Sequence, residues 1–121
     1  DMQELLAMRA IDARAHLAID MFCYQVRKNI AALAAVFGGL DALIFTGGIG
    51  EHGAEIRLEI CRGLEFLGVY LDMAKNKKNQ RTISRIKCRP TVLVFPAQEN
   101  LAIARHTTAL LASSWSQNSI S

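Results

Sequence analysis

One short segment, residues 41–51, constrains the fold of this 121-residue chain more than any other. It reads Asp-Ala-Leu-Ile-Phe-Thr-Gly-Gly-Ile-Gly-Glu, an apolar run that ends in Thr46 and glycines and then opens into a helical pattern. The apolar run is continuous rather than alternating, which favours a strand buried on both faces, as in a parallel sheet. A strand, a glycine turn and a helix in this order therefore predict an α/β fold.

The same glycine turn is a candidate phosphate site. Gly47, Gly48 and Gly50 have no Cβ, so the backbone can turn sharply and approach a ligand closely. The helix that follows directs unpaired N–H groups and its positive dipole end to the same place. The turn is neither a Walker A loop nor G-x-G-x-x-G. A purely structural turn could use the same glycines, so spacing alone leaves both interpretations open.

Composition indicates an ordinary globular chain, with 51% hydrophobic and 21% charged residues, large enough for one domain or part of one. No apolar run reaches the roughly 20 residues that a membrane span needs. The acidic, polar start is unlike a signal peptide, and because the chain begins with Asp1 rather than Met we expect a fragment of a longer protein.

The three cysteines, Cys23, Cys61 and Cys88, are widely spaced and form no C-x-x-C motif. They indicate neither a zinc site nor a set of disulfides, and we expect reduced cysteines in a cytoplasmic protein. Seven basic residues crowd into positions 75–89. Such a cluster could meet nucleic-acid phosphates, but it lacks interleaved aromatic residues, so a solvated basic loop is the favoured interpretation.

Strands and helices should alternate along residues 1–112, followed by a polar tail at 113–121. Asp12 can cap a long helix that ends at Gly38-Gly39, as glycine past a helix C-terminus should. The expected helices cover about 2–9, 12–37, 54–66 and 99–111, and the expected strands cover 42–45 and 91–95. Between them we expect a short strand or connector at 69–71, a loop with one helical turn at 73–82, and a weakly extended stretch at 83–87. Two or three strands are few for a parallel sheet, so we expect further strands outside this sequence.

A second group of polar residues follows the strand at 91–95. Pro96-Ala97-Gln98-Glu99-Asn100 lies where that strand ends and a helix is expected to begin. Ligands of open parallel sheets collect outside the carboxyl ends of the strands, so Glu99 and the glycine turn should share one edge. A carboxylate near bound phosphates is a suitable Mg²⁺ ligand. Alternatively, Glu99 only stabilises the first turn of its helix.

Several ordered motifs resemble the acetate kinase family. Phe45-Thr-Gly-Gly-Ile-Gly-Glu51, followed by Ile56-Arg57, is similar to its F-T-x-G-[IV]-G-E-N segment. Leu64-Glu-Phe-Leu-Gly68 with Asp72 and Asn76 resembles its L-x-x-L-G…D…N stretch. Val94 to Glu99, with Leu101, Ile103, Ala104 and Arg105, resembles the end of the family region, V-x-P-T-N-E-E-L-x-I-A-R-D. Asp1-Met2-Gln3-Glu4-Leu5 resembles its opening, D-x-R-E-L.

The resemblance implies part of an actin-like, ribonuclease H-like ATPase domain with a mostly parallel sheet. It implies phosphoryl transfer between ATP and acetate or another short-chain carboxylate, with ATP or ADP and Mg²⁺ as cofactors, and a homodimer as the assembly. By position, the nucleotide contacts would be Gly48, Ile49, Gly50, Glu51 and His52. The border of the adenosine pocket would be Asp1, Met2 and Gln3, and Glu99 would help to hold Mg²⁺.

Several positions depart from the family pattern. His52 replaces Asn, and Gln3 replaces Arg, which removes a planar cation that could stack on the nucleotide. The other departures are Ala97, Gln98, Asn100 and His106. They are compatible with altered nucleotide preference or with an impaired enzyme.

The family's catalytic Asp and Arg, its transition-state His and its carboxylate pocket lie in upstream sequence that these residues do not match. Because phosphoryl transfer depends on positioning and charge stabilisation, we expect negligible activity from this chain alone. The alternative from another class is a non-catalytic fragment that oligomerises and binds no nucleotide.

Overall fold

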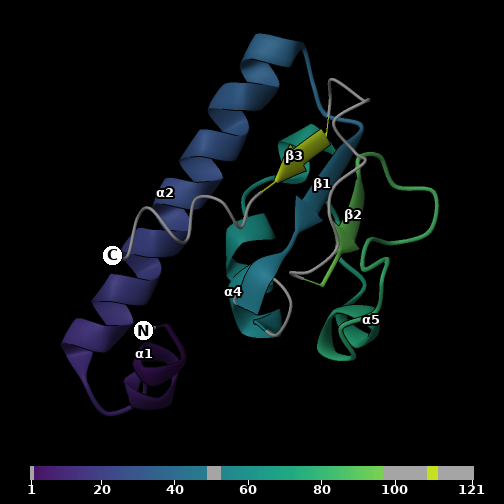
Figure 1. The fold of residues 1–121 in the computed structure, drawn as a ribbon. Helices are drawn as coiled ribbons and strands as arrows, with labels where there is room; N and C mark the ends of the chain where they lie inside the picture. The colour runs from purple at the N-terminus through teal and green to yellow at the C-terminus, as the bar shows by residue number, and fades with distance from the viewer. Residues whose placement is uncertain (1, 49–52, 97–108, 112–121) are drawn as a thin grey trace.

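The centre of the structure, a computed structural model that describes residues 2–48, 53–96 and 109–111, is a parallel sheet (Figure 1). Its strands are β1 (Ala42–Phe45), β2 (Thr91–Val94) and β3 (Ala109–Leu111), in the order β2-β1-β3. Ala42 of β1 is in register with Thr91 on one side and with Ala109 on the other. The parallel sheet and the strands predicted at 42–45 and 91–95 are therefore confirmed, the second ending one residue early.

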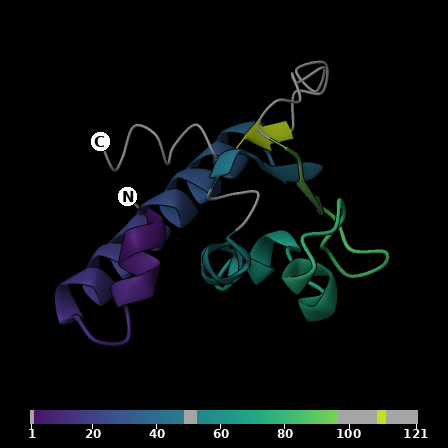
Figure 2. The same ribbon diagram turned by 60° about the horizontal axis from the view of Figure 1, so that its bottom comes forward.

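Two helices precede the sheet, α1 (Met2–Met8) and α2 (Ala13–Phe37), as the sequence predicted. The Asp12 side chain accepts a hydrogen bond from the Arg14 backbone N–H and so caps α2. At the other end Gly38 takes a left-handed conformation with φ 78°, and its N–H donates to the Ala34 carbonyl. The long helix α2 runs past the sheet in both views (Figures 1 and 2).

The helix after the glycine turn is shorter than the predicted 54–66. Helix α4 (Ala54–Cys61) ends at Arg62, whose backbone is extended, and a separate 3-10 turn η1 (Glu65–Leu67) follows. Gly63 between them has φ 105°, a conformation that an α-helix cannot continue through. The Arg27 guanidinium of α2 donates to the last carbonyls of α4, those of Glu59 and Ile60, at 2.7 and 3.2 Å. These bonds replace the helical partners that the carbonyls lack.

The segment between η1 and β2 is mostly irregular. Asp72 caps the short helix α5 (Met73–Lys77), which is the single helical turn that the sequence predicted. Leu71 and Thr82 each form one antiparallel bridge, with Ser84 and Leu93 respectively. Residues 69–71 are therefore a connector rather than a full strand.

The helix predicted at 99–111 is wrong at its C-terminal end. Ala109–Leu111 is a strand whose backbone pairs with β1, so the register places Leu111 beside Ile44. This pairing satisfies the second edge of β1, a long-range requirement that helical periodicity in the segment does not reveal. The rest of the predicted helix lies outside the described residues.

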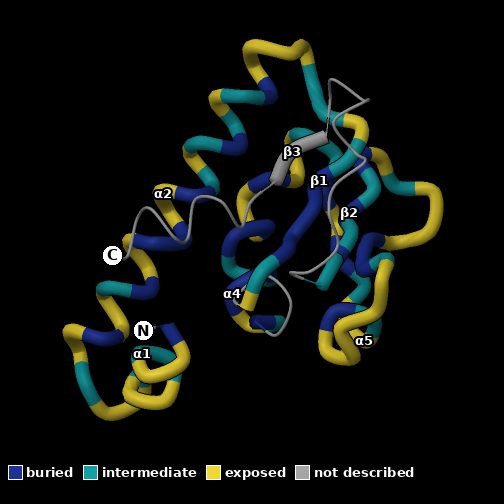
Figure 3. Tube along the Cα trace, viewed as in Figure 1, coloured by how far each residue is buried: buried dark blue, intermediate teal, exposed yellow. Residues whose placement is uncertain are grey.

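The hydrophobic core lies between the inner side of α2, the sheet and α4 (Figure 3). The strand β1 is buried over Leu43, Ile44 and Phe45, as its continuous apolar run predicted. The helices and loops that cover it contribute Ile19, Phe22, Val26, Ile30, Ile56, Ile60, Leu64, Val69 and Ile83. This packing fixes β1 and α4, the two elements that flank the glycine turn.

Candidate functional site at the carboxyl edge of the sheet

Two backbone segments meet where β1 and β2 end. The Phe95 N–H donates to the Phe45 carbonyl at 2.9 Å, which extends the parallel pairing one residue beyond β2. The Thr46 hydroxyl then donates to the Pro96 carbonyl at 3.3 Å. Both predicted motifs therefore begin at the same edge of the sheet. Glu99, the predicted metal ligand, lies outside the described residues.

The first half of the glycine turn is described, and it is open. Gly47 has φ 81°, a conformation that favours glycine. Gly48 is exposed, and a Cβ built on it would meet no atom within 4 Å. The turn thus leaves space in front of its backbone, as close approach of a ligand requires. Ile49, Gly50, Glu51 and His52 lie outside the described residues.

The predicted adenosine border is described at two of its three positions. Met2 is 3% exposed and belongs to the hydrophobic core, whereas Gln3 is exposed on α1. Of these two side chains, Gln3 is therefore the one that could meet a ligand at the surface. Asp1 lies outside the described residues.

A buried arginine on α4 was missed by the sequence interpretation. Arg57 has no exposed surface, and its guanidinium donates at 2.8 Å to both the side-chain and the backbone carbonyl of Asn76. It also donates to the Asn79 side chain, and the Asn76 amide donates to the Ala54 carbonyl at 2.9 Å. Burial lowers the Arg57 pKa to about 10. This network holds the first turn of α4 to α5. Arg57 and Asn76 both match the family motifs, and that match was the signal in the sequence that could have revealed the network.

A second arginine connects three helices. Arg9, just after α1, forms ion pairs with Asp20 of α2 at 3.5 Å and with Glu55 of α4 at 3.0 Å, and a further ion pair with Glu59. Its Nε also donates to His16 Nδ1 at 3.3 Å. Burial alone would lower the Arg9 pKa, but the hydrogen bond and charge of Glu59 and the charges of Glu55 and Asp20 raise it above its ordinary value.

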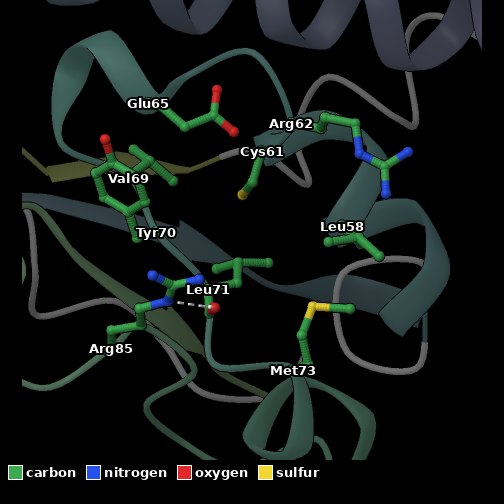
Figure 4. Close-up of a pocket in the computed structure, with 9 residues that line it drawn as sticks. All are labelled: Leu58, Cys61, Arg62, Glu65, Val69, Tyr70, Leu71, Met73 and Arg85. Carbon is green, nitrogen blue, oxygen red and sulfur yellow. Dashed lines mark hydrogen bonds between the residues drawn. The ribbon is translucent and has the colours of Figure 1, made fainter.

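One pocket of about 130 Å³ lies at the last turn of α4, whereas the glycine turn precedes the first turn of that helix. Arg62 and Arg85 lie on opposite sides of it (Figure 4), and Arg85 donates to the Leu71 carbonyl at 3.4 Å. Cys61 lines this pocket, but burial raises its pKa to about 12, so the thiol stays protonated at neutral pH. The pocket therefore offers no activated nucleophile.

Neither a metal cluster nor a membrane span is found in the part of the chain that the structure describes. Within residues 2–48, 53–96 and 109–111, no three His, Cys, Asp or Glu side chains are grouped so that they could hold a metal ion. The described oxygens at the carboxyl edge, from Thr46 and Pro96, are of the type that Mg²⁺ prefers. The carboxylate predicted to bind the ion, that of Glu99, lies outside the described residues. None of the described helices is long and apolar enough to cross a membrane.

These features define a portion of an α/β domain in which Thr46, after one parallel strand, and Pro96, after its neighbour, meet at the carboxyl edge of the sheet. The sequence profile of the Acetokinase family matches residues 1–105. The chain belongs to the acetokinase family.

Curated relatives and solved structures agree with this assignment. The chain is 52% identical over 100 residues to an acetate kinase of Treponema denticola and 46% identical over 114 residues to one of Phocaeicola vulgatus. Those matches cover 81% and 92% of this chain, but 25% and 29% of the relatives. The chain thus spans between a quarter and a third of the length of these acetate kinases.

Three solved structures share the fold. The crystal structure of Porphyromonas gingivalis acetate kinase matches with a TM-score of 0.74 at 35% identity, over 79% of this chain and 25% of that one. A propionate kinase from Francisella tularensis matches with a TM-score of 0.73 at 39% identity, over 79% of this chain and 25% of that one. The acetate kinase of Entamoeba histolytica gives 0.75 at 31% identity, over 87% and 30%. The predicted partial α/β domain of this family is confirmed.

Proposed function

We propose that this chain is the C-terminal nucleotide-binding part of an acetate or propionate kinase. The whole enzyme would transfer a phosphoryl group between ATP and a short-chain carboxylate, and the chain alone would have negligible activity. The observation that carries this proposal is the hydrogen bond from Thr46 to the Pro96 carbonyl. It supports the proposal because it joins the segments that lead into both predicted ligand motifs at one sheet edge.

In this proposal the residues 48–52 contact the phosphates of ATP or ADP through backbone N–H groups. The open space at Gly48 supports such an approach. Gln3 borders the adenosine together with Asp1, and Met2 anchors the start of α1 in the hydrophobic core. Glu99 helps to hold Mg²⁺, which when bound would neutralise phosphate charge. The free state of Cys23, Cys61 and Cys88 supports a cytoplasmic location.

Isothermal titration of the purified chain with MgADP and MgATP tests nucleotide binding. We expect saturable heat for both nucleotides. The Gly48→Ala variant should fold normally, since its Cβ meets nothing within 4 Å, but should bind at least about tenfold more weakly if the backbone must touch phosphate. Absence of heat from the unmodified chain would reject the proposal. Robust Mg²⁺-dependent acetyl phosphate formation by the chain would reject its predicted lack of activity.

A second candidate function, a self-associating fragment without nucleotide binding, is favoured by one specific observation. Leu17, Met21 and Tyr24 follow each other at helical spacing on α2 and are 57%, 59% and 58% exposed. An apolar stripe of this kind marks an interaction surface. We propose a homodimer through this face in either case. Light scattering should show a dimer that Met21→Glu converts to a monomer; an unchanged mass would exclude this interface.

A further inference from the structure

We propose that Arg9 is a positioning residue that fixes the distance between the two walls of the nucleotide site, the glycine turn and the start of α1. This inference rests on the proposed function and deepens it. Among the residues that the structure describes, the hydrogen-bond and ion-pair partners of Arg9 include no predicted ligand contact. It joins the helix that begins with the predicted adenosine border to the helix that begins after the predicted phosphate turn.

The geometry of the Arg9 side chain suits such a clamp. The guanidinium is planar and holds several donors in a fixed fork, so it can bind carboxylates on two elements at once. Its Nη1 meets Glu55 Oε1 at 3.0 Å, and its Nη2 meets Glu59 and, at 3.5 Å, Asp20. The side chains of Arg9 and Glu59 are only 17% and 18% exposed. A partly buried arginine with several carboxylate partners contributes more to stability than an isolated surface ion pair does.

The positions of the two glutamates explain why α4 responds to this clamp near the ligand. Glu55 lies in the first turn of α4, and Glu59 lies one turn later on the same side. The last turn of α4 is held separately, by Arg27 on the Glu59 and Ile60 carbonyls. Arg9 therefore holds α4 at both turns, through Glu55 at the end next to residues 46–52 and through Glu59 in the last turn, whereas Arg27 binds the last turn alone.

The binding affinity of a ligand that spans both walls should depend on Arg9 more strongly than the affinity of either half of that ligand does. When two linked groups bind two sites, the second contact gains from the effective concentration that correct spacing creates. ADP carries both groups, adenosine carries one, and pyrophosphate carries the other. A looser spacing lowers the affinity for ADP and leaves the affinities for adenosine and pyrophosphate unchanged. General damage to the domain lowers the affinity for all three ligands.

The experiment measures dissociation constants of ADP, adenosine and pyrophosphate, each with Mg²⁺ present, for the full chain and its variants by NMR titration. Arg9→Gln should raise the dissociation constant of ADP by about tenfold and change those of adenosine and pyrophosphate by less than about twofold. Arg14→Gln is the matched control, because the Arg14 side chain is 93% exposed and its ion pair among the described residues is with Asp12, at 3.6 Å. Arg27→Gln is a second control, because it loosens only the last turn of α4, the end away from the glycine turn.

A charge exchange keeps the test decisive if Arg9→Gln folds poorly. Arg9→Glu with Glu59→Arg retains one arginine among three carboxylates, so ADP affinity should recover relative to Arg9→Glu alone. Unchanged ADP affinity in Arg9→Gln, an equal loss for all three ligands, or no recovery in the exchange would overturn the positioning role. If the unmodified chain binds no ADP, the proposed function itself fails, and this inference fails with it.

Discussion

The Thr46 hydroxyl donates a hydrogen bond to the Pro96 carbonyl 3.3 Å away, and this contact joins positions 50 residues apart at the carboxyl edge of the sheet. Thr46 is only 7% exposed, so water cannot easily replace its partner. The bond fixes the exit of β2 against the exit of β1. The two predicted ligand segments therefore start from a shared and rigid origin.

The Thr46–Pro96 hydrogen bond is open to direct test. Thr46→Val keeps the shape of the side chain but removes the donor, so we expect the free energy of unfolding to fall by about 1 kcal/mol. Thr91→Val is the control, because the Thr91 hydroxyl has no hydrogen bond within the described residues. Urea denaturation of both variants measures the difference. Equal stability of the two variants would contradict a stabilising role for this bond.

Gly68 should be far less tolerant of substitution than Gly48. Its φ is 91°, and an added Cβ would collide with the Arg89 backbone carbonyl, which cannot swing aside as a side chain could. We expect Gly68→Ala to destabilise the fold by about 3 kcal/mol, and Gly48→Ala to leave stability nearly unchanged. Thermal unfolding compares the two variants. A Gly68→Ala protein as stable as the unmodified chain would show that the loop at Arg89 is not packed as described.

The buried Arg57 network should be a main source of stability for the start of α4. Arg57→Met preserves much of the side-chain volume but leaves the acceptors of Asn76 and Asn79 without their donor. Hydrogen bonds to charged groups contribute about 1.5–3 kcal/mol each, so we expect a total loss of at least about 3 kcal/mol. Arg14→Met, at a 93% exposed position, should lose almost none. Similar urea midpoints for the two variants would argue against this network.

Stability should fall as the pH rises above about 9. Burial is the main cause that raises the pKa of Cys23 and of Cys61 from 9.0 to about 12. Because the unfolded thiols ionise first, the stabilising difference is complete below pH 9 and is lost progressively between pH 9 and pH 12. Arg57, whose pKa is lowered to about 10, acts in the opposite sense above about pH 10.

The comparison that isolates the thiols uses the double variant Cys23→Ala, Cys61→Ala. Its free energy of unfolding should be lower at pH 8 because two buried side chains are truncated. From pH 8 to pH 10.5, however, its stability should decline less than that of the unmodified chain. Parallel slopes for the two proteins in urea titrations would show that these thiols do not titrate differently in the folded and unfolded states.

Local signals were sufficient to predict the elements that carry their own boundaries. Asp12 and Gly38 mark the two ends of α2 by capping chemistry, which acts within one turn of the helix. The apolar run at 42–45 predicted β1, since a central parallel strand is apolar on both faces. The shared edge of the two motifs followed from topology alone, and the contact of Thr46 with Pro96 agrees with it.

The errors arose where distant parts of the chain decide local structure. Arg27, far from α4 in sequence, binds the carbonyls at which that helix ends, and the predicted helix ran past this point. Ala109–Leu111 pairs with β1, which overrides the local helical pattern. The burial of Arg57 depends on acceptors from Asn76 and Asn79, and no residue next to it in sequence signals them.

We propose that the start of α1 and the glycine turn are two walls of one nucleotide site. An NMR titration of the ¹⁵N-labelled chain with MgADP probes both walls in one experiment. We predict saturable shifts, with a single dissociation constant, for the amides of Gln3, Gly47 and Gly48, and none for Val69 beside the separate pocket. Shifts absent from all three residues, or confined to the basic segment 75–89, would show that these two segments do not form a nucleotide site.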